Sequence, residues 1–396
     1  MAVRIVRQPN KIALLGAPTS AAAMSAGHEK APSALRSAGL VDRLRAVGYE
    51  VADMGDDPVQ LFHQDDESPR ARNVGRVLKS LEALKPRVEL AVKSGALPLI
   101  LSGDCSIALA TLAGARRYLR HVGLVYVDRD ADLNIPATTP SGCVDGMVVS
   151  HVVGRGAAEM VRFWGEPPLV REPDVALFGV GRLDPPEQEV LDRTPLRRYL
   201  AADVRRMGAS TAAQTAVERI RGAGNDFVLH VDVDVIDGFA ATNYPGEGGL
   251  SLELVREALR VFATQRNLAA IEICAYNPEK DPDGSAARVV IDLIGDVLGE
   301  RLRALQADAP AHSAEVKTGD APSAVPEDPA AKAPGVTAGE AWSSDLLEAG
   351  SEVPDATPEG ASEEGPAASP RVSEESEDVG PASSIETSEE ADNSNS

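Results

Sequence analysis

Short apolar segments alternate with longer amphipathic segments along most of the chain. The short segments are rich in Leu, Ile and Val and are bounded by Gly, Asp or Pro, which is typical of strands buried on both faces. They cover residues 11–16, 96–101, 123–128, 174–180, 226–232 and 268–273. Helical patterns lie between them at residues 73–93, 106–120, 211–222 and 252–265. This alternation predicts an α/β fold, with a mostly parallel sheet covered by helices on both faces.

The alternation ends near Gln306. The sequence beyond it is rich in Ala, Pro, Ser, Glu and Gly and nearly free of aromatic residues. Such a segment cannot bury enough apolar surface to offset the entropy lost on ordering. We therefore expect a globular domain over residues 1–306 and a disordered acidic tail over residues 307–396.

One short apolar cluster lies inside the tail. Trp342, Leu346 and Leu347 have the spacing of one face of a short helix. This spacing suggests a docking peptide that folds on a partner, and a chance apolar cluster is the alternative.

Charge is distributed unevenly between the two parts. Residues 307–396 hold 21 acidic and 3 basic residues, so the tail carries −18 of the chain's net charge of −22. The near-neutral domain has no clustered Lys and Arg of the kind that nucleic-acid binding requires. No stretch approaches the roughly 20 apolar residues that span a bilayer, and three cysteines are too few for a disulfide framework. We expect a cytoplasmic protein that binds neither nucleic acid nor membrane.

Polar residues cluster where three of the expected strands end. The strand at 123–128 runs into three alternating aspartates, the strand at 226–232 runs into two, and the strand at 96–101 runs into Ser-Gly-Asp-Cys-Ser. Ligands of parallel sheets bind outside the carboxyl ends of the strands. Alternate residues of an extended segment share a face, so Asp128, Asp130 and Asp132 are expected to converge, as are Asp232 and Asp234. Crowded carboxylates favour a divalent cation among them, whereas capping of the following helices is the alternative.

A calcium-binding EF-hand loop also begins with alternating aspartates, and it is excluded here. Leu133 stands where that loop requires Gly, and Thr139 stands where it requires a bidentate Glu.

A series of sequence blocks resembles the arginases of the ureohydrolase superfamily. In chain order the blocks are LLGAPTS, GHEKAPSALRSAGL, SGDCSIALATLAG, VDRDADLNIPATTPSGCVDGM, GVGRLDPPEQ, VDVDVID, GEGGLS and ICAYNP, and they span about residues 10–300. The resemblance implies a three-layer α/β/α fold around an eight-stranded sheet, often in trimers or hexamers. It also implies hydrolysis of a linear C–N bond in an amidino- or guanidino-type amino-acid-like substrate, by a hydroxide that two manganese ions activate.

The resemblance implies six metal ligands, two of which are changed in this chain. The four aspartate ligands are kept as Asp128, Asp132, Asp232 and Asp234. Cys105 and Asp130 stand where the family has histidines. Both can ligate a metal, but a thiolate shifts preference from manganese toward softer ions such as zinc, so zinc or no ion is the alternative. Arg129, at a position where arginases usually have a small residue, is expected to offset the added negative charge.

The resemblance also implies substrate-binding and catalytic residues. Ser141, Asp184 and Glu187 match positions that hold the amino-acid end of the substrate, and Cys143 replaces an asparagine of that set. Asp145 matches the proton-shuttling histidine, and a catalytic role is assigned to Asp145 and Asp130.

The position that pairs with the substrate guanidinium is also changed. Ala275 stands where the family has a glutamate. Losing such a charge-assisted contact costs about 2–5 kcal/mol. We therefore do not expect ordinary hydrolysis of L-arginine.

Three cysteines and two histidines in or near these blocks also need an interpretation. Cys105, Cys143 and Cys274 all fall within the blocks, either as a metal-binding or redox-active thiol cluster or, for the latter two, as buried fillers. His230 precedes Asp232 by two residues and is expected to pack beneath the site as a core histidine, and His151 is expected to be structural.

Two functions of different classes remain open. The first is a metal-dependent hydrolase of the ureohydrolase type with altered metal and guanidinium sites. The second is a catalytically silent family member that acts in binding, assembly or regulation. Metal bound with a defined stoichiometry separates the two.

Overall fold

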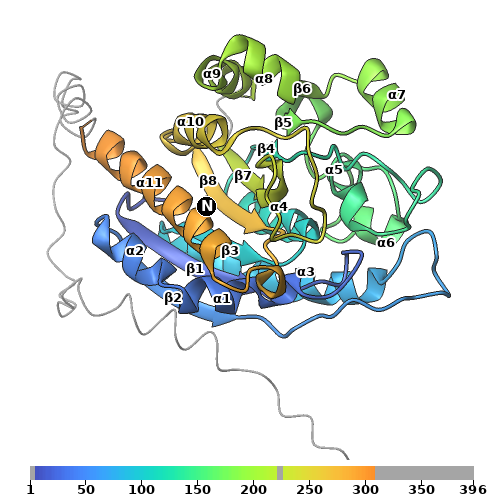
Figure 1. Ribbon diagram of the computed structural model, residues 1–396, viewed down its shortest axis with the longest axis horizontal. Helices are drawn as coiled ribbons and strands as arrows, with labels where there is room; N and C mark the ends of the chain where they lie inside the picture. The colour runs from blue at the N-terminus through green and yellow to red at the C-terminus, as the bar shows by residue number, and fades with distance from the viewer. Residues whose placement is uncertain (1–4, 221–225, 308–396) are drawn as a thin grey trace, which may run out of the picture. The chain divides into compact units, whose positions relative to one another are not determined.

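The computed structural model describes residues 5–220 and 226–307. Eight parallel strands form one sheet in the order β2-β1-β3-β8-β7-β4-β5-β6 (Figure 1). The strands are β1 Lys11–Ala17, β2 Glu50–Asp56, β3 Leu97–Ser102, β4 Val122–Val127, β5 Val175–Val180, β6 Arg197–Leu200, β7 Asp226–Asp232 and β8 Leu268–Cys274. The predicted α/β fold with a parallel sheet is confirmed.

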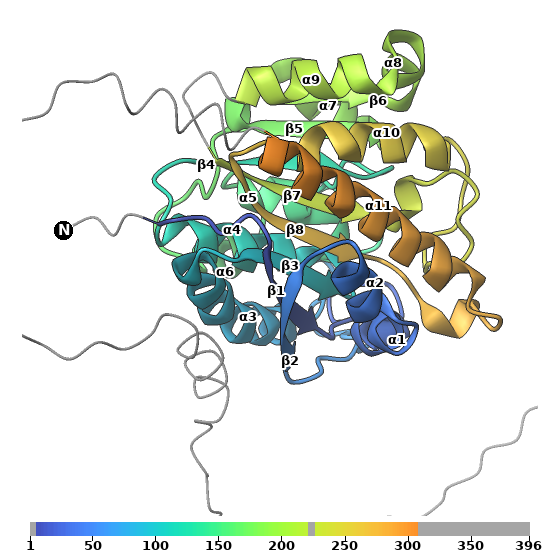
Figure 2. The ribbon, with the colours of Figure 1, turned by 90° about the vertical axis from the view of Figure 1, so that its left-hand side faces the viewer.

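Helices cover both faces of the sheet, and each face has its own apolar core (Figures 1 and 2). The first core contains side chains of α1 Ala31–Ser37, α2 Leu40–Ala46, α8 Ala201–Met207, α9 Ala209–Ile220, α10 Leu252–Ala263 and α11 Ser285–Ala307. The second contains side chains of α3 Val74–Ser94, α4 Ala108–Arg116, α5 Val148–Val152, α6 Ala158–Val161 and the end of α7 Pro185–Arg193. The result is the three-layer α/β/α arrangement that the resemblance implies.

The six expected strands are the six interior strands of the sheet. β3, β4 and β5 are buried at every position, which is why their sequences read as continuous apolar runs. The two strands that the pattern missed, β2 and β6, lie at the edges of the sheet. β2 is largely exposed and β6 has only four residues, so neither carries a strong apolar signal.

The sheet topology brings distant parts of the chain to one edge. β3, β8, β7 and β4 are neighbours, and β7 ends level with β8, since Asp232 pairs with Cys274. Residues that follow these four strands therefore meet beyond the centre of the sheet.

Two expectations concern the rest of the chain. In the described ranges, no helix is long and apolar enough to cross a membrane. α11 ends at Ala307, and the remaining tail, with Trp342, Leu346 and Leu347, lies outside the described residues.

Candidate functional site

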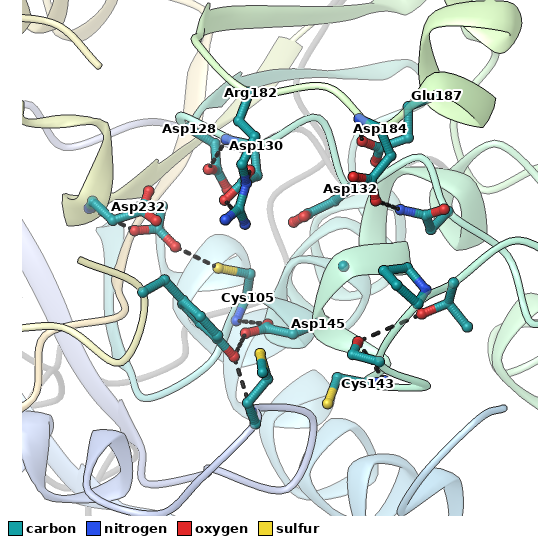
Figure 3. A pocket seen from close by; sticks show the side chains of 18 residues that line it. Cys105, Asp128, Asp130, Asp132, Cys143, Asp145, Arg182, Asp184, Glu187 and Asp232 are labelled. Atoms are coloured by element: carbon teal, nitrogen blue, oxygen red, sulfur yellow. Dashed lines mark hydrogen bonds and ion pairs between the residues drawn. The ribbon is translucent and has the colours of Figure 1, made fainter. Parts of the chain in front are cut away.

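A cavity of about 470 Å³ opens at the carboxyl ends of the central strands (Figure 3). All eleven residues to which the sequence analysis gives a metal-binding, substrate-binding or catalytic role line it. They are Cys105, Asp128, Asp130, Asp132, Ser141, Cys143, Asp145, Asp184, Glu187, Asp232 and Asp234, with Asp130 counted in two roles. The cavity therefore joins the expected metal ligands to the expected substrate contacts.

The floor of the cavity holds two groups of metal-type donors. Cys105, Asp128 and Asp232 form one group, and Asp128, Asp130 and Asp234 form the other, with the donor atoms of each group within 4.8 Å of one another. Backbone N–H groups hold the aspartates in place, because Asp130 N donates to Asp128 Oδ1 and Asp234 N donates to Asp232 Oδ1, each at 2.7 Å. The Cys105 thiol donates to Asp232 Oδ2 at 3.0 Å.

Burial and mutual repulsion make this floor a poor place for bare negative charge. Desolvation, with the charges of neighbouring aspartates, raises the pKa values of Asp128 and Asp232 well above the usual range. Desolvation and the Asp130 charge raise the pKa of Asp234 to about 6, although the Arg129 charge opposes the shift. A cation among these carboxylates would stabilise their ionised form, and so would oppose the effects of burial and of mutual repulsion.

Of the three alternating aspartates that were expected to converge, Asp128 and Asp130 share a donor group and Asp132 does not. The backbone turns at Asp132, where φ is 50°, so the segment is not extended. The Asp132 carboxylate accepts a hydrogen bond from the Tyr126 hydroxyl and belongs to neither donor group. Asp132 still lines the cavity, but beside the floor donors rather than among them (Figure 3).

Two guanidinium groups neutralise one side of the floor. Arg129 is buried, and its Nη2 lies 3.0 Å from Asp234 Oδ2 and donates to the Tyr244 carbonyl at 2.7 Å. Arg182 forms a two-point contact with Asp130, with Nη2 2.8 Å from Oδ2. The contact of Arg129 with Asp234 agrees with its expected charge-offsetting role. Arg182 was missed, although it lies in the GVGRLDPPEQ block just beyond β5.

The far side of the cavity holds the expected substrate contacts. Asp184 and Glu187 form the capping box of α7. Both Glu187 oxygens are used by the backbone, Oε1 by Leu133 N and Oε2 by Asp184 N, each at 2.9 Å. Glu187 therefore positions this rim. Asp184 Oδ2 accepts a hydrogen bond from Asn134 Nδ2 at 2.8 Å. The Asp184 carboxylate and the Ser141 hydroxyl can each form a further hydrogen bond to a ligand.

Asp145 connects the floor to the Tyr244 loop. Its Oδ1 accepts from Cys105 N at 2.8 Å, and its Oδ2 accepts from the Tyr244 hydroxyl at 2.9 Å. Desolvation and the charge of Asp104 raise the pKa of Asp145 to about 7. Tyr244 lies outside the motifs identified in the sequence, so sequence reasoning missed it.

A second layer of polar side chains lies beneath the floor. Cys274 Sγ is 3.3 Å from Cys105 Sγ and 3.4 Å from His230 Nε2. His230 Nδ1 is 2.8 Å from Glu272 Oε2, and its ring stacks on Tyr126 with centroids 4.2 Å apart. His230 is a buried histidine as expected, and Glu272 is the partner that sequence reasoning missed. Cys274 is buried, as the filler interpretation expects, and its sulfur also lies against that of Cys105, as the thiol-cluster interpretation expects.

Comparison with known proteins places these features in a family. The profile of the arginase family matches residues 10–299. The chain belongs to the arginase family. It is 29% identical to an arginase of Bacillus caldovelox over 296 residues, which cover 74% of this chain and 99% of that one. It is 30% identical to an arginase of Brevibacillus brevis over 293 residues, which cover 74% and 98%.

Solved structures agree with this placement. The arginase of Bacillus cereus superposes with a TM-score of 0.68 at 28% identity, covering 73% of this chain and 98% of the other. Proclavaminate amidino hydrolase from Streptomyces clavuligerus, at 18% identity and a TM-score of 0.57, shares the fold. The arginase family is metal-dependent, and the floor of this cavity holds groups of side chains that could bind a metal ion.

The residues of this chain do not fit a centre of two manganese ions. Asp130 and Asp234, which the second ion would need, are already bound by Arg182 and Arg129. A second ion would lie beside the buried guanidinium of Arg129 and the partly exposed guanidinium of Arg182. Among the residues that the structure describes, none brings a guanidinium to the Cys105 side, which offers sulfur as well as oxygen, so the floor fits one divalent ion at that side.

Proposed function

We propose that this arginase-family chain is a hydrolase of a linear C–N bond in an amidino- or guanidino-type amino-acid-like substrate, with one divalent ion in place of two. The observation that carries the proposal is the single cavity in which the donor cluster at Cys105 faces Asp184 and Ser141. A substrate held at its amino-acid end by Asp184 and Ser141 would extend its reacting end toward the floor.

The ion would be held at the Cys105 end of the floor. An ion in this place supplies Lewis acidity toward the C=N group of the substrate and lowers the pKa of a water. Arg129 and Arg182 keep Asp130 and Asp234 compensated when no second ion is present. Asp130 then acts by holding Arg182 at the cavity wall.

Three residues perform the remaining steps. Asp145, fixed by Cys105 N and the Tyr244 hydroxyl, holds and passes the proton at its carboxylate. Asp184 pairs with the α-ammonium group of the substrate, and Ser141 donates to its α-carboxylate. Cys143, whose backbone N donates to Ser141 Oγ at 3.1 Å, orients that hydroxyl.

The substrate differs from that of an arginase at its reacting end. Ala275 is buried and offers no carboxylate to a guanidinium. A substrate whose reacting group is less strongly cationic than guanidinium therefore fits this cavity better than L-arginine does.

Product release tests the proposal directly. The full chain, loaded with zinc or manganese under reducing conditions, is incubated with amino acids bearing amidino, formimino, guanidino or amide groups. Ammonia, urea and formamide are then measured. We expect release from at least one substrate, loss of that release in Asp145→Asn, and little release from L-arginine. No release from any of these classes would contradict the proposal.

The two arginines support a second candidate. Because Arg129 and Arg182 already neutralise part of the floor, the cavity can persist without an ion. A catalytically silent protein that binds an amino acid would use the same Asp184 rim. In that case amino-acid ligands raise the unfolding temperature of the metal-free chain, and no product appears.

A further inference from the structure

The buried layer under the cavity floor brings two further side chains, His230 and Cys274, against Cys105. Cys105, His230 and Cys274 are buried, and one ligand atom of each lies within 4.8 Å of the others. Cys105 comes from the turn after β3, His230 from β7 and Cys274 from the end of β8. Three separate strands of the sheet therefore present two sulfurs and one imidazole nitrogen to a common point.

The spacing of these atoms is close to that around a tetrahedral zinc ion. Zinc–sulfur bonds of about 2.3 Å and zinc–nitrogen bonds of about 2.0–2.1 Å place two sulfurs about 3.8 Å apart, and a sulfur about 3.6 Å from a nitrogen. Here the Cys105 and Cys274 sulfurs are 3.3 Å apart, and Cys274 Sγ is 3.4 Å from His230 Nε2. Movements of a few tenths of an ångström would make room for the ion.

The histidine of this set is already oriented for ligation. Its Nδ1 lies 2.8 Å from Glu272 Oε2, which leaves Nε2 directed at Cys274. A histidine that ligates a metal through one nitrogen and contacts a carboxylate through the other is the usual arrangement in zinc proteins. Stacking on Tyr126 fixes the plane of the ring.

We propose that Cys105, His230 and Cys274 bind a single zinc-type ion, with the fourth coordination position turned toward Asp232 and the cavity. Cys105 and Asp232 line the cavity, whereas His230 and Cys274 lie below it. Two thiolates and one imidazole favour zinc over manganese. Three protein ligands with one open position are the pattern of catalytic rather than structural zinc sites.

This inference deepens the proposed function, on which it rests for the role of the ion, and moves the ion from the aspartates to the thiols. Its test measures how many ions the chain binds and whether thiolates ligate them, which can be done without measuring turnover. If the thiols bind zinc but no product is released, the proposed function is contradicted and the zinc site stands. If turnover survives the loss of Cys274, the zinc site is contradicted and the proposed function stands.

The test titrates the full chain, stripped of metal and kept reduced, with cobalt(II) and then with zinc(II). We expect one cobalt per chain, with the thiolate charge-transfer absorption and the strong visible bands of tetrahedral cobalt. One equivalent of zinc should displace it, and excess manganese should not. Absence of thiolate-to-cobalt absorption would overturn the proposal.

Matched variants decide which donors are used. Cys274→Ala should lose tight zinc binding, whereas Asp128→Asn and Cys143→Ala should keep one equivalent. The opposite pattern, with zinc lost in Asp128→Asn and kept in Cys274→Ala, would place the ion on the aspartates and overturn the proposal.

A milder variant covers the case in which Cys274→Ala does not fold. Glu272→Gln keeps the shape of the side chain that contacts His230 and removes its charge. We expect its zinc affinity to fall about 10–100-fold while its circular dichroism stays unchanged. An unchanged affinity in folded Glu272→Gln would also overturn the proposal.

Discussion

The guanidinium of Arg129 lies 3.0 Å from the carboxylate of Asp234, and each side chain is only 2% exposed. A buried ion pair of this kind is stable only while both partners are present. It lies on the side of the cavity floor where Asp128, Asp130 and Asp234 would otherwise share a cation. The chain thus supplies its own positive charge at this point, which limits the floor to one ion.

Removing Arg129 should destabilise the metal-free protein and make it depend on added cations. Arg129→Met leaves Asp234 buried without a partner, which costs about 3–5 kcal/mol of unfolding free energy. Manganese should restore part of that loss, because an ion can then reach Asp234. Urea unfolding with and without manganese measures both effects.

Two controls accompany this measurement. Arg129→Met combined with Asp234→Asn should recover stability without metal, since no charge is left unpaired. Arg182→Ala should cost less than about 1 kcal/mol, because the Arg182 side chain is 62% exposed. An Arg129→Met protein as stable as the unchanged chain, with no response to manganese, would contradict the role given to Arg129.

Two substitutions of Asp184 should distinguish its role in ligand binding from its role in capping α7. Asn caps helices as well as Asp does, so Asp184→Asn should preserve α7 and remove only the charge. We expect amino-acid ligands to bind at least about tenfold more weakly to Asp184→Asn, the loss of one charge-assisted contact. Calorimetric titration checks this.

Asp184→Ala is the matched comparison. It removes both the charge and the cap, so it should also lower the unfolding free energy by about 1 kcal/mol. Equal ligand binding by Asp184→Asn and the unchanged chain would show that the rim does not hold an ammonium group.

Restoring a carboxylate at position 275 should increase affinity for guanidinium ligands. Ala275→Glu offers the charge-assisted partner that the resemblance to arginases implies there, and L-arginine should bind at least about tenfold more tightly. Ala275→Gln, of similar size and without charge, should show no gain. L-Ornithine, which lacks the guanidinium group, should bind both variants alike, and equal gains for the two ligands would argue against this explanation.

His151 should make stability depend on pH. Burial lowers its pKa to about 4 from 6.5, so the folded chain keeps it neutral while the unfolded chain protonates it. The unfolded state binds more protons between these values, so stability is complete above pH 6.5 and falls as pH drops toward 4. Protonation of His151 in the unfolded chain should lower the unfolding free energy by about 3 kcal/mol across this pH range.

A variant isolates this contribution from the acidic groups. His151 Nε2 accepts from Ala157 N at 3.2 Å, and His151→Asn removes the titrating group at some cost in stability at every pH. The difference in unfolding free energy between the two proteins should shrink between pH 6.5 and 4. A constant difference across that range would contradict a neutral buried His151.

The sheet was predictable from the sequence where its strands are buried on both faces. The continuous apolar runs of β3, β4 and β5 carry that information directly. The sequences of β2 and β6 carry little of this information, because these strands lie at the edges of the sheet, where they are more exposed to solvent. The direction of the chain after β4 was not predictable either, since the alternation of aspartates does not reveal the positive φ at Asp132 or the hydrogen bond of its carboxylate with Tyr126.

The candidate site was predictable where its residues follow strands in recognisable blocks. Cys105, Asp128 and Asp232 belong to this group. Tyr244 and Glu272 do not, because one lies in a loop without a motif and the other inside a strand whose apolar pattern hides it. The role of Glu272 follows from strand pairing, which sets it beside His230, and the role of Tyr244 follows from the hydrogen bond of its hydroxyl to Asp145.

The cavity floor is expected to hold one divalent ion, and counting the ions that the full chain binds tests this expectation. The chain, expressed with manganese and zinc present and purified under reducing conditions, is measured by native mass spectrometry and elemental analysis. Because Arg129 and Arg182 already neutralise Asp234 and Asp130, and because sulfur ligands favour zinc, the expected result is one zinc per chain, unchanged by excess manganese. Two manganese ions per chain would contradict the account, and so would a chain that binds no ion.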